Sequence, residues 1–177
     1  DIRPLLPKHS PGGVPEYTRE LVKAMLDKIN MKNLPLRIIL FSSGKEKPKL
    51  HFFEKYKKIY EHYHLSIYNQ AFNVSLKLFQ FPEIDILIKK ECRISPQEKI
   101  IVFAPNINLL PLSKSARLVA TFHDLSFERY PFFLSAKDRV WHRMIAPRAI
   151  TKRANKIIAV SESTKQDLTP SKLEVII

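Results

Sequence analysis

Short apolar runs, separated by stretches of helical periodicity, constrain the fold of this chain more than any other feature of its sequence. The runs are near-continuous and rich in β-branched residues, which is typical of strands buried on both faces of a parallel sheet. Five of them occur, at Leu36–Phe41, Ile100–Ala104, Leu118–Phe122, Ile157–Val160 and Leu173–Ile177. We therefore predict parallel strands at these positions.

Helical periodicity is clear in Glu16–Ile29, which precedes the first run. Pro15 occupies a position that suits the first residue of a helix. Apolar residues recur at every fourth position, which predicts a helix whose buried stripe contains Tyr17, Leu21, Met25 and Ile29, widened by Ala24 and Leu26.

Two further segments between the runs are predicted to be helical. Leu50–Tyr63 is aromatic and rich in lysine, and Phe53, Tyr56, Lys57 and Tyr60 keep the helical period. Ser161–Leu168 reads as a short helix, because Ser161 or Ser163 can accept hydrogen bonds from its first free amides.

A longer helix is predicted from Ser135, as its N-terminal cap, towards Asn155. Pro147 should bend or break it, because proline lacks the amide that an interior helical position needs. The side chains that this helix is expected to bury are Val140, Trp141, Met144 and Ile145.

Strands that alternate with helices imply right-handed crossovers and a doubly wound parallel α/β sandwich. A length of 177 residues fits a single domain over residues 1–177, and the three glycines leave little for a flexible linker. Because the chain opens on Asp1 and closes within an apolar run, we expect it to be a piece of a longer protein.

The composition excludes several classes of protein. Cys92 is the only cysteine, so no internal disulfide can form, and no Cys/His cluster has metal-binding spacing. No apolar run approaches the roughly 18–20 residues that cross a bilayer. No nucleophilic triad or paired-carboxylate motif can be recognised. We expect a cytoplasmic protein that binds no metal.

The net charge of +13 predicts attraction to polyanions, namely nucleic acid, anionic lipid or phosphorylated small molecules. Helix faces rich in lysine and covered by solvent explain such a charge equally well. The predicted long helix is especially basic and lies near aromatic residues, which suits anionic lipid, an anionic ligand or solvent; these residues are Arg139, Arg143, Arg148, Lys152 and Arg153, with Phe132, Phe133 and Trp141.

Ligands of parallel α/β sheets bind beyond the carboxyl ends of the strands, and His123 and Asp124 follow one predicted strand directly. An imidazole there can donate to a sugar hydroxyl or a phosphate, or transfer a proton. Asp124 could fix the tautomer of the imidazole or accept a substrate hydroxyl. The alternative is a histidine bonded to backbone and an aspartate that serves the turn.

Other candidates lie at equivalent positions. Gly12 and Gly13 form a strand-to-helix turn that allows close backbone approach by an anion such as a diphosphate, although a plain tight turn explains them too. Polar side chains also follow two further strands and are either ligand contacts or ordinary turn and cap residues: Asn106 and Asn108, and Ser161, Glu162 and Ser163.

Taken in order, five segments resemble a known family: GGVPEYTRELVKAM, FAPNINLLPL, ARLVATFHDLSFERYP, KRANKIIAVSESTKQDL and KLEVI. They are similar to the amino-terminal half of retaining GT-B glycosyltransferases of family 4, glycosyl transferase group 1. The similarity is strongest over residues 102–168, whereas residues 45–98 carry little of it.

The resemblance implies a Rossmann-like amino-terminal, acceptor-side domain, one of two that face each other across a cleft. The carboxy-terminal domain, which holds most of the nucleotide sugar, is absent from this chain. By resemblance Gly12 and Gly13 approach the donor phosphates, His123 contacts the transferred sugar, and the turn with Ser161 and Ser163 lines the cleft. The full set of expected site residues comprises His123 and Asp124 as catalytic, and Gly12, Gly13, Tyr17, Asn106, Asn108, Ser161, Glu162 and Ser163 as substrate-binding.

The implied activity is transfer of a sugar from a nucleotide-sugar donor to a carbohydrate or lipid-linked acceptor, without a metal or other cofactor. Peripheral contact with an anionic membrane at its inner face is a further expectation, and no transfer is expected from this chain alone. The alternatives are a non-catalytic binding or scaffold domain of the same fold and half of a sugar-nucleotide epimerase. Nucleic-acid binding, suggested by the positive charge and by Tyr56, Tyr60 and Tyr63 among lysines, is not expected, because no recognised nucleic-acid motif is present.

Overall fold

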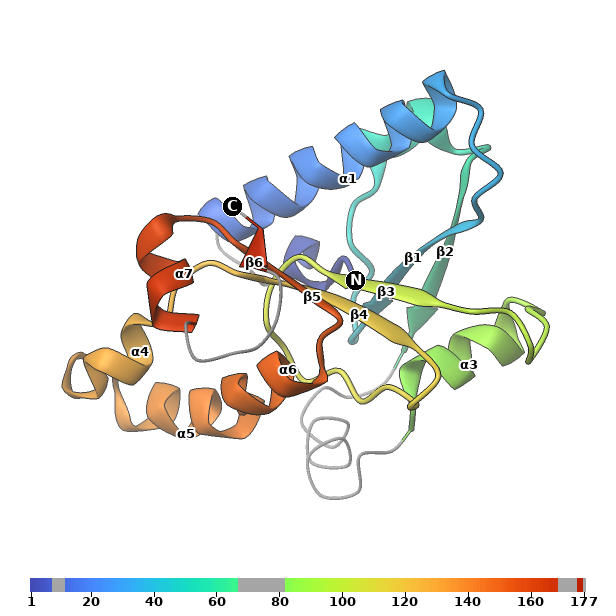
Figure 1. Ribbon diagram of the computed structural model, residues 1–177. Coiled ribbons are helices and arrows are strands. Elements are labelled where there is room, and N and C mark those ends of the chain that lie inside the picture. The colour runs from blue at the N-terminus through green and yellow to red at the C-terminus, as the bar shows by residue number, and fades with distance from the viewer. Residues whose placement is uncertain (8–11, 67–81, 169–174, 177) are drawn as a thin grey trace. The chain divides into compact units, whose positions relative to one another are not determined.

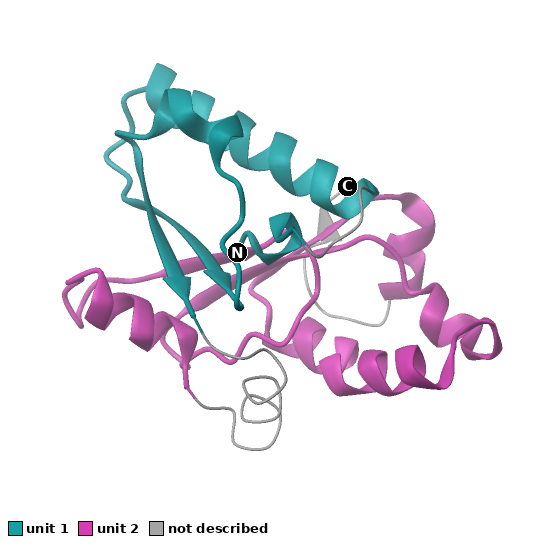
Figure 2. Ribbon diagram, turned by 180° about the vertical axis from the view of Figure 1, so that it is seen from behind, with its two compact units in different colours: residues 1–72 teal, residues 73–177 magenta. Residues whose placement is uncertain are grey.

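The computed structural model describes residues 1–7, 12–66, 82–168 and 175–176. The chain divides into two compact units, Asp1–Phe72 and Asn73–Ile177, each with a hydrophobic core of its own (Figure 2). The strands within each unit pair in parallel, and helices connect most of them, which confirms the predicted α/β class. The single domain over residues 1–177 stays a prediction.

Unit 1 contains a long helix and a pair of parallel strands. Its elements, in chain order, are η1 (Arg3–Leu5), α1 (Gly13–Met31), β1 (Ile38–Ser43), η2 (His51–Tyr56) and β2 (Tyr60–Leu65) (Figure 1). The strands pair in register from Ile38 opposite Tyr60 to Ser43 opposite Leu65. Side chains from α1, β1 and η2 share one buried cluster, which includes Val22, Leu26, Leu40, Phe53 and Tyr56.

Helix α1 confirms the predicted helix but begins at Gly13, two residues before Pro15. Its buried residues are Thr18, Val22, Leu26 and Ile29, so most of the buried stripe lies one position along from the predicted one. Thr18 tolerates full burial because its hydroxyl donates to the carbonyl of Val14 at 2.8 Å. Met25 and Ala24, which were predicted to be buried, are exposed.

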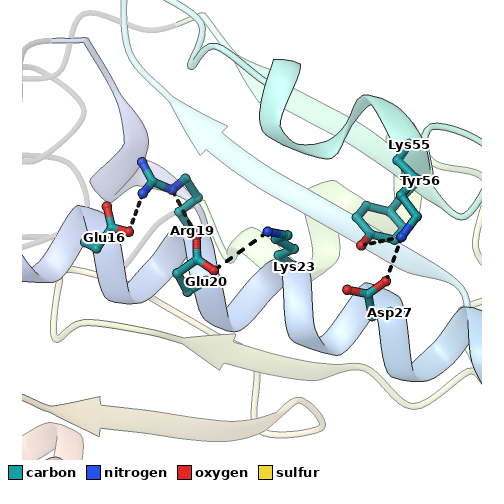
Figure 3. Close-up of polar contacts among 7 residues, drawn as sticks. All are labelled: Glu16, Arg19, Glu20, Lys23, Asp27, Lys55 and Tyr56. Carbon is teal, nitrogen blue, oxygen red and sulfur yellow. Dashed lines mark hydrogen bonds and ion pairs between the residues drawn. The ribbon is translucent and has the colours of Figure 1, made fainter.

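The solvent face of α1 carries a series of ion pairs (Figure 3). Arg19 pairs with Glu16 and also with Glu20, at 3.3 Å. Near the other end of the helix the Lys55 ammonium donates to Asp27 at 3.2 Å. Hydrogen bonds from the Tyr56 hydroxyl and then from Lys55 lower the pKa of the Asp27 carboxyl. Helix α1 carries as many acidic as basic residues, so it adds nothing to the net positive charge of the chain.

The predicted helix over Leu50–Tyr63 is wrong. The segment forms the short 3₁₀ helix η2 and then enters strand β2. Phe53 and Tyr56 are buried as the period suggested, but Tyr60 onwards pairs with β1. Pairing satisfies the backbone groups of β1, and Tyr is a residue that packs well on a strand, so tertiary contacts override the local helical pattern.

Unit 2 contains a four-stranded parallel sheet with the strand order β3–β4–β5–β6. These strands are β3 (Ile101–Ala104), β4 (Arg117–Phe122), β5 (Lys156–Ala159) and β6 (Val175–Ile176). They confirm the predicted strands within about a residue where described; the rest of the Leu173–Ile177 run lies outside the described residues. Because strand order here follows chain order, a doubly wound sheet stays a prediction.

The helices of unit 2 precede, connect or follow these strands. They are α3 (Ile84–Glu91), α4 (Ser126–Arg129), η3 (Pro131–Phe133), α5 (Ala136–Ile145), α6 (Pro147–Arg153) and α7 (Glu162–Leu168). The core draws side chains from β3, β4 and β5 and from the covering helices, including Ala104, Leu118, Phe122, Ile145, Ile157 and Leu168. No helix in the described ranges is long and apolar enough to span a bilayer.

The predicted long helix exists as two helices, α5 and α6 (Figure 1). Ser135 caps α5 as predicted, because its hydroxyl accepts from the amide of Asp138 at 3.1 Å. The break falls at Ala146, whose φ of 52° is left-handed, directly before Pro147. Ile145 is buried and Trp141 partly so, but Val140 is 60% exposed, which corrects its predicted burial. The buried stripe of α5 runs through positions 141 and 145, and Val140 lies one position off it.

Side chains of α3 and α6 form hydrogen bonds with the segment that leads into β4. The buried carboxylate of Asp85, on α3, accepts from the amide of Ser113 at 2.8 Å and from its hydroxyl at 2.6 Å. The guanidinium of Arg153, on α6, donates to the carbonyls of Ser113 at 2.6 Å and Ala116 at 2.7 Å. These bonds satisfy backbone groups of a connection that has no secondary structure of its own.

Candidate functional site

The carboxyl ends of three strands of unit 2 are joined at His123. The imidazole Nε2 donates to the carbonyl of Pro105, which follows β3, at 2.9 Å. The carbonyl of His123 accepts from the hydroxyl of Thr164, on the helix that follows β5, at 3.1 Å. His123 itself follows β4, so residues after β3, β4 and β5 meet at one edge of the sheet, which we call the His123 edge.

The bond to Pro105 determines the tautomer of the His123 ring. A carbonyl oxygen can only accept, so Nε2 carries the hydrogen, and this holds for the neutral and the protonated ring alike. The side chain is half-buried. The predicted alternative, a histidine bonded to backbone, is thus present at Nε2, and the same bond gives the ring a fixed orientation at the edge where ligands of such sheets bind.

Asp124 is exposed and serves the turn that leads into α4. Its Oδ1 accepts from the amide of Ser126 at 3.0 Å and from the hydroxyl of Ser126 at 2.6 Å. This geometry is that of a residue that satisfies the first free donors of a helix.

Ser161 caps α7 in the same way. Its hydroxyl accepts from the amide of Thr164 at 3.2 Å and lies 3.0 Å from the Thr164 hydroxyl. The cap interpretation of Ser161 is therefore confirmed. Ser163 and Glu162 are both exposed on the first turn of α7, and Glu162 forms an ion pair with Lys165 at 3.8 Å. Thr164, which the sequence analysis missed, connects the Ser161 cap to His123.

Asn106 and Asn108 follow β3 in the segment that begins with Pro105, and both are half-buried. The side-chain oxygen of Asn108 accepts from the amide of Leu109 at 2.8 Å, which is typical of a turn-forming asparagine. Both asparagines therefore share a loop with the acceptor of the His123 hydrogen bond.

Gly12, Gly13 and Tyr17 belong to unit 1 and lie at the start of α1. Gly12 has an extended backbone, with φ of −177°, which any residue can adopt. A Cβ at Gly13 would meet no atom of the described chain within 4 Å, so the backbone there borders open space. Tyr17 is half-buried on the next turn. The remainder of the predicted loop, residues 8–11, lies outside the described residues.

A second histidine cluster lies where β1 ends in unit 1. The hydroxyl of Ser42 is 2.8 Å from His62 Nε2 and 2.8 Å from His64 Nδ1, and Ser42 is fully buried. His64 Nε2 donates to the carbonyl of Gly44 at 3.1 Å. Gly44 has a φ of 145°, a conformation that favours glycine, so the position of this carbonyl depends on that residue.

The directions of these bonds follow from the Gly44 carbonyl. Because His64 donates from Nε2, the neutral ring accepts at Nδ1, so the Ser42 hydroxyl donates to it. The Ser42 oxygen can then accept from His62 Nε2. Burial, followed by repulsion from His64 and Lys47, lowers the pKa of His62 below its ordinary 6.5. Burial also lowers the pKa of His64. Burial thus favours the neutral form of both rings, and the bond that His64 accepts at Nδ1 requires a neutral ring.

The sequence contains a signal for this cluster. His62 and His64 are two positions apart, which places them on the same face of a strand. The signal was missed because the preceding residues have a helical period. Within the described ranges no group of three or more histidine, cysteine or acidic side chains could hold a metal ion.

Comparisons of the chain with protein-family models, curated protein sequences and solved structures found no match.

Proposed function

We propose that this chain is the amino-terminal, acceptor-side domain of a retaining GT-B glycosyltransferase of family 4, with a Rossmann-like doubly wound sheet. The whole enzyme would transfer a sugar from a nucleotide sugar to a carbohydrate or lipid-linked acceptor on the cytoplasmic side. The support is the order of the five sequence segments together with one geometric observation. That observation is the meeting of the residues after β3, β4 and β5 at His123.

In this proposal the acceptor and the transferred sugar lie beyond the His123 edge. The bond from Nε2 to Pro105 fixes the plane of the imidazole, so little freedom is lost when a sugar hydroxyl contacts the ring. The Asn106–Asn108 loop and the first turn of α7 add polar groups at the same edge. The exposed hydroxyl of Ser163 is the candidate contact on α7, because the hydroxyl of Ser161 already caps that helix.

The leaving diphosphate requires groups that neutralise its charge without a metal. Fixed cationic groups and backbone amides can do this when they are aimed at the charge that develops. The open space beside Gly13 is compatible with approach of the donor phosphates to the backbone there. The carboxy-terminal domain would supply the remaining contacts, and retention would follow from donor and acceptor lying on the same face of the sugar.

A second candidate function, a non-catalytic carbohydrate-binding domain of this fold, is favoured by a specific observation. Polar groups of three predicted site residues already make structural bonds: His123 to Pro105, Asp124 to Ser126, and Ser161 to Thr164. Such bonds would hold a binding surface in place without any catalytic role.

The decisive experiment compares His123→Ala with His123→Gln in the protein produced from the complete reading frame. Glutamine places an amide donor close to the position of Nε2, so it can keep the bond to Pro105 while lacking the ring. We expect both variants to lose about 100-fold or more in turnover with UDP-, GDP- or ADP-sugars. Thermal unfolding, followed through Trp141, should be close to that of the wild type for His123→Gln.

Wild-type turnover in His123→Gln, with loss only in His123→Ala, would show that His123 acts through Pro105 alone and would remove it from the active site. If the protein transfers no sugar from any donor but still binds oligosaccharides, the binding-domain candidate replaces the enzyme.

A further inference from the structure

Three aromatic side chains in unit 2 lie at the surface instead of in the core. Tyr130, Phe132 and Phe133 are 48%, 69% and 80% exposed. Phe132 and Phe133 belong to η3 and Tyr130 directly precedes it, between α4 and α5. Their rings contact one another: the centroids of Phe132 and Phe133 are 4.6 Å apart, and Tyr130 lies 6.2 Å from each. We call these three residues the aromatic cluster.

A contiguous exposed aromatic surface of this kind marks a site of interaction, whereas single exposed apolar residues are ordinary. Ring packing holds the three side chains together, so the cluster is a preformed apolar projection. Two of its members, Phe132 and Phe133, have no polar group that could form a hydrogen bond with water.

Basic side chains lie directly beside this projection. Pro131 and Leu134, which flank the two phenylalanines in the chain, line a pocket of about 330 Å³ together with Arg139, Arg143 and Arg148. The stacked pair of Phe127 and His142, with centroids 4.1 Å apart, lines the same pocket. Between Ser126 and Arg153 the chain carries seven Lys or Arg and two Asp or Glu residues, a net charge of +5.

The charges in this region are not all compensated within the chain. Arg148 pairs with Glu128, with Nε to Oε2 at 2.9 Å, and Arg129 pairs with Asp167. In the described part of the chain, however, the guanidinium groups of Arg139 and Arg143 have no ion-pair partner. Two unpaired arginines therefore accompany the exposed aromatic cluster.

We propose that the aromatic cluster, with Arg139 and Arg143 of α5, binds the surface of a membrane that contains anionic phospholipids. Aromatic rings are favoured at the boundary between headgroups and acyl chains, and basic residues beside them are attracted to anionic headgroups. A headgroup phosphate can accept bidentate hydrogen bonds from a guanidinium at the mouth of the pocket. This inference goes beyond the proposed function and does not depend on sugar transfer.

Nucleic acid fits this surface less well than lipid does. Single-stranded nucleic acid needs separate ring faces on which successive bases stack. Here the rings pack against one another, with interplanar angles of 86° for Tyr130 with Phe132 and 44° for Phe132 with Phe133. A compact apolar projection instead suits insertion into a lipid boundary.

The test is co-sedimentation of the protein with phosphatidylcholine vesicles, with and without phosphatidylserine, at low and physiological salt. We expect binding only with phosphatidylserine, weakening as salt rises. Arg139→Gln with Arg143→Gln should weaken binding about thirtyfold, since each basic residue near an anionic surface contributes about 1 kcal/mol. Phe132→Ser with Phe133→Ser should weaken it about tenfold or more at both salt concentrations.

Two matched controls separate this surface from the overall charge. Lys28→Gln with Lys32→Gln removes the same charge from exposed positions in the last turn of α1 and directly after it, and Phe52→Ser removes an exposed aromatic ring of unit 1. Both should bind vesicles nearly as the wild type does. Thermal unfolding should be unchanged in all four variants, because every substituted side chain is exposed or at the surface.

Equal losses of binding in the lysine control and in the arginine variant would show that binding depends on net charge alone, which would overturn the proposal. Absence of vesicle binding also overturns it. If, in that case, the phenylalanine variant abolishes self-association measured by sedimentation, the cluster is a contact between copies of the chain. If it abolishes binding of a single-stranded oligonucleotide, the ligand is nucleic acid.

Discussion

Both units place histidine in or directly after a parallel strand, but they hold it in different ways. In unit 1 His62 and His64 bond to each other through Ser42, so side chains are both donors and acceptors. In unit 2 His123 bonds to the backbone carbonyl of Pro105, which accepts whatever the charge of the ring. The difference teaches that the bond between Ser42 and His64 Nδ1 requires a neutral ring, whereas the bond from His123 Nε2 to a backbone carbonyl does not.

The largest effect is expected for Asp85→Ala in unit 2. The substitution removes both bonds to Ser113 and leaves a buried amide and a buried hydroxyl without that acceptor. We expect a loss of about 2–4 kcal/mol in the free energy of unfolding, because bonds to a buried carboxylate are stronger than neutral ones. Denaturant unfolding followed by the fluorescence of Trp141, the only tryptophan, reports on unit 2.

Asp85→Asn keeps the size and one acceptor oxygen, and it should recover part of that loss. A stability of Asp85→Ala within about 0.5 kcal/mol of the wild type would mean that Ser113 easily finds other hydrogen-bond partners. Bonds to backbone groups would then matter less in unit 2 than the comparison with unit 1 implies.

The second test lowers the pH. The pKa of His62 and that of His64 are below the ordinary 6.5 in the folded protein, so the unfolded chain binds more protons in this range. The stability from these neutral rings is complete above pH 6.5 and is lost as the pH falls through the lowered values. Protonation of His64 disrupts the bond that its Nδ1 accepts from Ser42, whereas a protonated His62 still donates from Nε2 and carries only the cost of a charge on a half-buried ring. The loss should therefore reach about 1–2 kcal/mol.

His62→Asn with His64→Asn should remove this pH dependence, measured as the slope of unfolding free energy against pH. His51→Asn, at an exposed position of the same unit, is the matched control and should leave the slope as it is. NMR titration of the imidazole protons gives the two pKa values directly, and values at or above 6.5 would contradict the interpretation.

The smallest expected effect concerns Asp124 at the His123 edge. Asp124→Ala removes the acceptor for the amide and hydroxyl of Ser126 in an exposed turn and should cost about 0.5–1 kcal/mol. Asp124→Asn keeps an acceptor and should preserve stability. Any large loss of sugar transfer in Asp124→Asn, with stability unchanged, would therefore assign the carboxylate a catalytic role beyond that turn.

The strands of unit 2 could be predicted from the sequence because burial on both faces leaves an apolar run that few other structures explain. The same reasoning located the break before Pro147 and the cap at Ser135, where a single residue determines the local geometry. It also predicted that residues after β3, β4 and β5 share one edge, since that follows from parallel pairing.

Other features depend on contacts that no local pattern contains. Strand β2 carries tyrosine and histidine because its partners are β1 and Ser42, and its sequence therefore lacks an apolar run. The buried stripe of α1 includes Thr18 because a backbone carbonyl one turn earlier satisfies its hydroxyl. Thr164 and Asp85 were missed for the same reason, since their partners lie 41 and 28 residues away along the chain.

The hydrogen bonds of Asp85 and Arg153 to the segment before β4 also bear on the order of folding. Asp85 is made well before this strand, and Arg153 only after the helices that follow it. During synthesis from the amino terminus the ribosome therefore releases β4 before one of its two anchors exists. The bonds from Arg153 to Ser113 and Ala116 can form only once residue 153 has emerged, so we expect the sheet to be completed late in synthesis.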